Sequence, residues 1–202
     1  MKTHSKKTIA VITLGVFVFL EYFSDQFLQP LGQYTQYIAE FVFSLGALFL
    51  VGNYFAKKDH NRKTSFLALA IALVTGLGVR LLASPLGLPI PFDLGSAETL
   101  LFLLLIGPIL EELLYRGVLI EALSNIKNSP VAIMLVSALL FSLSHYRVIN
   151  SVPAELKSFV QYQTIYTFGL GLICAWLRLQ GGFIWAAGAH LLFNLGFYVG
   201  GF

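Results

Sequence analysis

The second half of the chain carries ionisable side chains inside long apolar stretches, where such groups are expensive to place. The first group is the pair Glu111 and Glu112, followed by Arg116. On a helix, Glu112 and Arg116 share a face because they are four residues apart, so an ion pair between them is expected. Glu111 is turned away and has no obvious partner on its own helix. A carboxylate in that setting is suited to act as a general base.

Two further residue pairs, each with at least one polar member, have the same four-residue spacing. Phe141 and His145 would share one helix face, with Phe141 as packing and His145 as a polar group. His190 and Asn194 would point together, and two donors aimed at one point can stabilise a developing oxyanion. A base, a water-positioning group and an oxyanion hole suffice for attack of water on a peptide carbonyl.

Each pattern also has a structural interpretation. Glu112 and Arg116 could form an ion pair that only stabilises a helix bundle. His145 could be a helix-end histidine that binds a backbone carbonyl. His190 and Asn194 could supply hydrogen bonds between helices, as polar residues do in membranes.

Two other hydrolytic chemistries have weaker support in the sequence. Glu111, His145 and His190 could form a zinc site of two histidines and one carboxylate, although no His-Glu-x-x-His run is present. Serine residues lie near His145, but no pair of histidine and acid is placed to activate them. We therefore expect no cofactor, and zinc is the alternative.

The composition is that of a membrane protein. Of the 202 residues, 57% are hydrophobic and 11% are charged, and the mean hydropathy is +0.78. Soluble domains are less apolar and about 25% charged, and disordered chains have the opposite bias, so both classes are excluded. The lone Cys174 excludes an intramolecular disulfide, and a net charge of +3 does not indicate nucleic-acid binding.

The apolar stretches predict an all-α, polytopic integral membrane protein with about seven transmembrane helices. The predicted spans are 8–27, 37–56, 64–83, 97–123, 131–149, 159–179 and 182–200. A count of six or eight is the alternative. We expect a single membrane domain over 1–202. It would comprise three N-terminal helices within 1–83, a linker at 84–96 rich in proline and glycine, and a catalytic four-helix core within 97–200.

Basic residues predict the orientation in the cell membrane. With the N-terminus in the cytoplasm, nine of them fall on the inner side and only Arg147 and Lys157 lie in outer loops. The nine are Lys2, Lys6, Lys7, Lys57, Lys58, Arg62, Lys63, Lys127 and Arg178. We therefore expect a multi-pass protein with a cytoplasmic N-terminus.

The three motifs together resemble a known family. The runs Glu-Glu-x-x-x-Arg, Phe-x-x-x-His and His-x-x-x-Asn are similar to those of the CAAX protease and bacteriocin-processing family of intramembrane glutamate proteases, formerly called Abi. The resemblance covers about 97–195. It implies that Glu111 activates a water, that His145 holds this water, and that His190 and Asn194 form the oxyanion hole.

The resemblance implies further properties. Glu112 and Arg116 would be a supporting pair behind Glu111, and the mechanism would need no metal. The substrate would be a peptide or a membrane protein within or against the lipid bilayer. A short, Phe-rich chain looks bacterial, which implies the plasma membrane and a role in peptide or bacteriocin processing or in self-immunity.

Two other functions remain open. A non-catalytic immunity factor or scaffold would use the same polar residues to bind a peptide or a membrane partner. A proton-coupled carrier would use them as a relay, but it would be expected to show an internal repeat, and we find none.

Overall fold

The computed structural model describes residues 3–32, 34–51, 61–126 and 129–202. Within these ranges helices are the only regular secondary structure and no strand occurs, which confirms the all-α prediction.

Every predicted span contains a helix. These helices are α1 (Thr3–Tyr22), α3 (Thr35–Val51), α4 (Arg62–Ala83), a continuous helix over 97–126, α8 (Pro130–Tyr146), α9 (Lys157–Gln180) and α10 (Phe183–Val199). The first helix ends earlier than predicted, at Tyr22, and is followed by the short α2 (Asp25–Leu28). The last residues of the predicted span 37–56 lie outside the described residues.

Local sequence signals set several boundaries. Asn61 caps α4, since its side chain accepts a hydrogen bond from the backbone N–H of Lys63. Ser96 caps the helix over 97–126 and Ser129 caps α8, which begins at Pro130. Gly182, with a φ of +97°, makes the tight turn between α9 and α10 that few other residues would adopt.

The helix over 97–126 is not a regular α-helix. It consists of α5 (Ala97–Leu101), α6 (Gly107–Glu112) and α7 (Ile120–Ile126), joined by π-helical segments at Phe102–Ile106 and Leu113–Leu119. Pro108 lacks the N–H of a regular helix, and the N–H of Gly107 reaches back five residues to the carbonyl of Phe102. The short α6, which carries both glutamates, is thus enclosed by two widened turns of the kind often found at functional sites.

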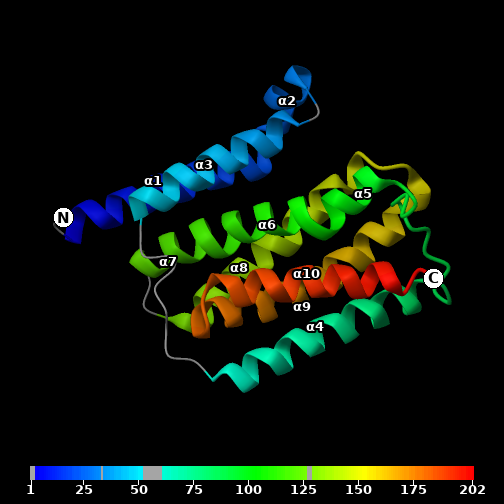
Figure 1. Cartoon of the computed structure of the whole chain (residues 1–202). Helices are drawn as coiled ribbons and strands as arrows, with labels where there is room; N and C mark the ends of the chain where they lie inside the picture. The colour runs from blue at the N-terminus through cyan, green and yellow to red at the C-terminus, as the bar shows by residue number, and fades with distance from the viewer. Residues whose placement is uncertain (1–2, 33, 52–60, 127–128) are drawn as a thin grey trace.

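The N-terminal helices lie on two sides of the bundle. α1 and α3 form a pair along one side of the helix over 97–126, whereas α4 lies on the opposite side and packs against α10 (Figure 1). The three N-terminal helices are therefore separated by the helices of the second half.

The contact between α4 and α10 depends on glycines. A Cβ added to Gly76 of α4 would collide with the backbone carbonyl of Phe193, and one added to Gly196 of α10 would collide with that of Leu73. Small residues at these positions let the two backbones approach closely, as in many membrane helix pairs. This contact fixes α10, and with it His190 and Asn194.

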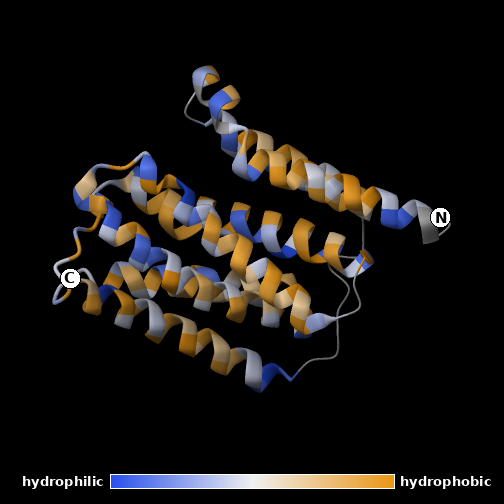
Figure 2. Cartoon of the chain, turned by 180° about the vertical axis from the view of Figure 1, so that it is seen from behind, coloured by the Kyte–Doolittle hydropathy of each residue, from blue (hydrophilic) through white to orange (hydrophobic). Residues whose placement is uncertain are grey.

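Hydrophobic residues run along the long helices of the bundle (Figure 2), and many of their side chains are exposed. Exposed examples on four helices are Ile12, Val42, Phe66 and Val131. By length and composition, two of the described helices, Arg62–Ala83 and Pro130–Asn150, could cross a membrane, and Thr35–Leu50 and Phe183–Val199 are shorter apolar helices.

Among the basic residues used to predict the orientation, Arg178 lies in the last turn of α9, where it is buried and pairs with Glu121 at 3.0 Å. Four others, Lys2, Lys57, Lys58 and Lys127, lie outside the described residues.

We predict that Gly76→Ala lowers the stability of the folded protein by about 1–3 kcal/mol, because the new methyl group forces α4 away from α10. The matched control is Gly78→Ala in the same helix, where an added Cβ meets nothing within 4 Å. The control should be neutral or slightly stabilising. Thermal unfolding in detergent, followed by size-exclusion chromatography, measures both. Equal melting temperatures for the two variants would contradict the close contact.

Candidate active site

The site contains a fully buried ion pair. Glu112 and Arg116 have no exposed side-chain surface, and Oε1 of Glu112 lies 3.4 Å from Nη1 of Arg116. The guanidinium lies over the ring of Phe141 at 4.5 Å from its centroid, and its Nη2 donates to the carbonyl of Gly171 at 3.2 Å. The predicted pairing and the predicted packing role of Phe141 are both present in the structure.

His190 connects the two glutamates. Its Nδ1 lies 3.0 Å from Oε1 of Glu112 and its Nε2 lies 3.5 Å from Oε2 of Glu111. With Arg116 neutralising Glu112, the natural assignment places a proton on Nδ1 that is donated to Glu112. Nε2, on the other side of the ring, faces the carboxylate of Glu111.

The two glutamates differ in access. The side chain of Glu111 is 37% exposed, whereas that of Glu112 is completely buried and that of His190 is 4% exposed. Glu111 can therefore meet a water or a substrate, and Glu112 acts only through the groups that it contacts.

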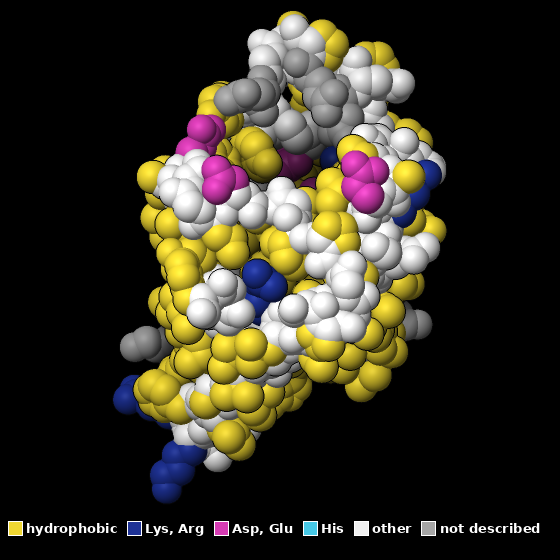
Figure 3. Space-filling view, turned by 90° about the vertical axis from the view of Figure 1, so that its right-hand side faces the viewer, with side chains coloured by type: hydrophobic (Ala, Val, Ile, Leu, Met, Phe, Trp, Pro, Cys, Tyr) yellow, Lys and Arg dark blue, Asp and Glu magenta, His cyan; other side chains and the backbone are white. Residues whose placement is uncertain are grey.

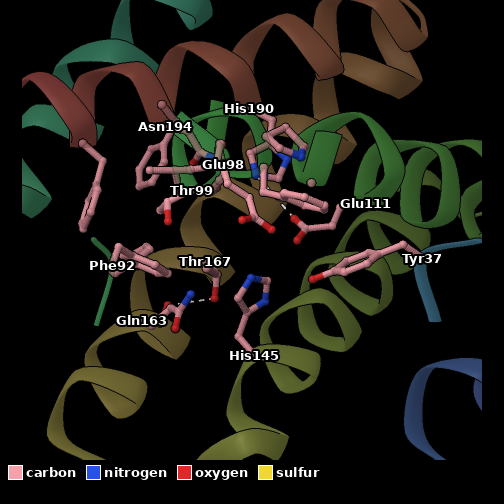
Figure 4. Close-up of a pocket in the computed structure, with 18 of the residues that line it drawn as sticks. Tyr37, Phe92, Glu98, Thr99, Glu111, His145, Gln163, Thr167, His190 and Asn194 are labelled. Atoms are coloured by element: carbon pink, nitrogen blue, oxygen red, sulfur yellow. Dashed lines mark hydrogen bonds and ion pairs between the residues drawn. The ribbon is translucent and has the colours of Figure 1, made fainter. Parts of the chain in front are cut away.

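His145 lies across the cavity from Glu111 (Figure 4). Its Nδ1 is 2.9 Å from the carbonyl of Phe141, four residues back on the same helix. If Nδ1 carries the proton, it donates to this carbonyl and Nε2 remains as an acceptor. His145 thus makes the backbone contact of the structural interpretation and also lines the cavity.

Asn194 differs from the expectation that it points to one target together with His190. Its Nδ2 donates to the carbonyl of Leu103 at 2.7 Å. Leu103 lies in the first π-helical segment, five residues before Pro108, which has no N–H to donate. Asn194 therefore satisfies a carbonyl that the widened turn leaves open, and its second amide hydrogen remains for another acceptor.

These residues line one cavity of about 510 Å³. Glu111, His145, His190 and Asn194 all contribute to its wall, whereas Glu112, Arg116 and Phe141 are not among its lining residues. Aromatic side chains make up much of the remainder, among them Tyr34, Tyr37, Phe92, Phe102, Tyr166 and Phe193. A cavity of this size, apolar with a few converging polar groups, is typical of a binding site.

Several residues of the site do not follow from the motifs. Tyr34 and Tyr37 enter the cavity wall from α3 and its N-terminal flank, and Glu98 enters from α5. Arg178 binds the carbonyl of Arg116 through Nε at 3.0 Å. Its burial has a sequence signal that was overlooked, because Gly171, Cys174 and Arg178 follow one another at helical spacing.

In the described part of the chain, the side chains are not arranged as the zinc alternative requires. No group of three or more His, Cys, Asp or Glu side chains there is placed to hold a metal ion. His190 has its two ring nitrogens directed at Glu112 and Glu111, and His145 lies on the far side of the cavity. The residues therefore do not fit the predicted set of two histidines and one carboxylate around a common centre.

Comparison with known proteins identifies the family. A family model described as Type II CAAX prenyl endopeptidase Rce1-like matches residues 94–196. The chain belongs to this family. The match spans just over half of the 202 residues and contains all seven motif residues named above. No curated protein and no solved structure matches the chain.

Membership of the Rce1-like family confirms the resemblance found in the sequence and supports a protease-like function. The family is embedded in membranes, and the two long apolar helices fit this. The helices α1, α3 and α4 lie outside the matched residues, although α3 contributes to the cavity.

We predict that Arg116→Ala destabilises the protein by about 3–5 kcal/mol, because it leaves Glu112 as an uncompensated buried charge. Removing both charges, with Glu112→Gln and Arg116→Met together, should recover part of this loss. The melting temperature in detergent reports both effects. A single variant that melts like the unmodified protein would show that the pair adds nothing to stability.

Proposed function

We propose that this protein is an intramembrane endopeptidase in which Glu111 activates a water for attack on a peptide bond. The observation that carries the proposal is the position of Glu111. It is exposed to a cavity, paired with His190 and faced by His145 across the space where a water and a peptide would fit.

The groups have complementary tasks in this reaction. Glu111 takes a proton from the water while Nε2 of His145 accepts the other water hydrogen and fixes its direction. The water oxygen then attacks the carbonyl carbon. The oxyanion that forms is stabilised by the protonated Nε2 of His190 and by the second amide hydrogen of Asn194. Glu111 returns its proton to the leaving amine as the peptide bond breaks.

Glu112 and Arg116 support this reaction without touching the substrate. Glu112 accepts from Nδ1 of His190, which holds the ring in one orientation. Arg116 supplies the opposite charge that holds Glu112 in place. In this proposal the protein supplies base and oxyanion hole from its own side chains, and no metal takes part.

We further propose that the seven helices cross the cell membrane with the N-terminus in the cytoplasm. α1 and α4 both begin at the end of the bundle that holds the N-terminus (Figure 1), and their first residues include Lys6, Lys7, Arg62 and Lys63. The other end carries the linker 84–96 and the segment between α8 and α9. This charge distribution fits the excess of basic residues on cytoplasmic sides.

The substrate that we propose is a membrane-associated peptide. The family resemblance and the apolar surface favour processing of a peptide such as a bacteriocin, or immunity against one, in a bacterial plasma membrane. A cavity of about 510 Å³ lined by aromatic rings accommodates a few residues of an extended peptide.

We predict that Glu111→Gln lowers cleavage by about 10²–10⁴-fold, because the amide is nearly isosteric but cannot accept a proton. The measurement is cleavage of a mixed peptide library by protein in nanodiscs, read by mass spectrometry, with and without a strong chelator. The melting temperature of the variant should be unchanged, since Glu111 is partly exposed.

Each outcome of that experiment has a meaning. Cleavage that the chelator abolishes would replace the proposed chemistry with metal catalysis. Equal cleavage by the variant and the unmodified protein would exclude Glu111 as the base. A biological effect that survives in Glu111→Gln would indicate a binding or immunity protein.

We predict the orientation by cysteine labelling. In a Cys174→Ser background, Glu155→Cys should react with an impermeant maleimide in intact cells, whereas Lys6→Cys should react only after permeabilisation. Both positions are exposed, and Cys174 is fully buried, so its replacement removes only background. The reverse labelling pattern would invert the proposed topology.

A further inference from the structure

Of the Asp, Glu, Lys and Arg side chains, only acidic ones line the cavity. The carboxylates of Glu98 and Glu111 are part of it, and none of its lining residues is Lys or Arg. Arg116 does not line the wall and is paired with Glu112. His190 lines the wall but is held between Glu112 and Glu111. At the Glu98 end the wall therefore offers a carboxylate with no Lys or Arg beside it in the lining, which attracts positive groups and disfavours negative ones.

Glu98 is held in place at the outer part of the cavity. The hydroxyl of Tyr34 donates to its Oε1 at 2.6 Å. The ring of Tyr34 stacks on Phe102 at 5.8 Å, and Tyr37 packs against the same ring at 5.4 Å. Among the described residues, no hydrogen bond reaches Oε2 of Glu98. A positioned carboxylate beside aromatic rings is a suitable receptor for an ammonium or guanidinium group.

Acidic side chains also lie around this cavity. Asp93 in the linker 84–96, Glu98 at the start of α5 and Glu155 between α8 and α9 are exposed. Figure 3 shows acidic side chains beside a hollow, with Lys or Arg side chains on the same face. Lys157 is also exposed, but it does not line the cavity.

We infer that Glu98, with Tyr34 and Tyr37, forms a specificity subsite that binds a lysine or arginine side chain of the peptide substrate. This inference rests on the proposed function and adds the substrate class.

The spacing along the helix fixes where the basic residue should lie. Glu98 and Glu111 are thirteen residues apart on one helix. At about 1.5 Å per residue this is roughly 20 Å. An extended peptide covers that distance with about six residues. The basic residue is therefore expected about four to six residues from the bond that is cleaved, with side-chain reach accounting for the range.

The test uses an apolar peptide that the unmodified protein cleaves, in which a single residue is scanned as Lys, Gln or Glu through successive positions. The kcat/KM for Lys should exceed that for Gln by about tenfold at one position within the stated range, and Glu should be the poorest substrate. In Glu98→Gln the ratio of Lys to Gln should fall to about one. In Glu98→Lys the preference should reverse towards Glu.

The controls separate the subsite from general surface charge. Asp93→Asn and Glu155→Gln remove exposed acidic groups that do not line the cavity, so the ratio of Lys to Gln should persist in both. A ratio of one in the unmodified protein, or a preference that persists in Glu98→Gln, would overturn the inference. Loss of the preference in the two control variants would do the same.

A binding measurement distinguishes failure of the subsite from failure of the proposed chemistry. If no peptide is cleaved, fluorescent forms of the Lys and Gln peptides are titrated against unmodified protein and Glu98→Gln in nanodiscs. Tighter binding of the Lys peptide that disappears in Glu98→Gln supports the subsite, even though the endopeptidase proposal fails. Equal binding of both peptides overturns the subsite.

Discussion

The buried charge of Glu112 is the constraint on which the site depends. A carboxylate without exposed surface must be neutralised and hydrogen-bonded, or the fold loses several kcal/mol. Arg116 provides the opposite charge from the next turn, and His190 provides a polar contact from α10. Because Glu112 engages His190 on one side, the opposite nitrogen of the ring is directed at Glu111. The contact of His190 with the exposed Glu111 thus follows from the requirement that the buried Glu112 be neutralised and hydrogen-bonded.

The widened turns of the central helix connect the site to its neighbours. In each π-helical segment, a side chain from another helix binds a backbone carbonyl. Asn194 of α10 binds Leu103, and Arg178 of α9 binds Arg116. Buried carbonyls require hydrogen-bond partners, so these two bonds also connect α9 and α10 to the helix over 97–126. The widened turn at Leu103 explains why Asn194 is bonded to the backbone of another helix.

Sequence periodicity predicts side-chain contacts within one helix but does not predict contacts between helices. The four-residue spacing predicted the pair of Glu112 and Arg116 because helix geometry alone brings them together. The contact of His190 with Glu112 joins residues 78 positions apart, and it depends on how closely α4 and α10 pack through glycines. Arg178 was counted as a basic residue of the inner side, but its charge does not reveal its partners, Glu121 and the carbonyl of Arg116. Hydropathy predicted a helix in each of the chosen spans but cannot reveal these partners.

The cavity is lined both by residues within the range that the family model matches and by residues outside it. The groups proposed for chemistry all lie within 94–196, the residues matched by the family, whereas Tyr34 and Tyr37 come from outside that range. Glu98 lies within the match, yet its position depends on Tyr34. A change at Tyr34 or Tyr37 can therefore alter the part of the cavity around Glu98 while the contact of α4 with α10, which positions His190, stays as it is. In our proposals, Glu98 is held by Tyr34 from outside the matched range and Glu111 is held by His190 from within it, so selection of substrate and bond cleavage would rest on different contacts of one cavity.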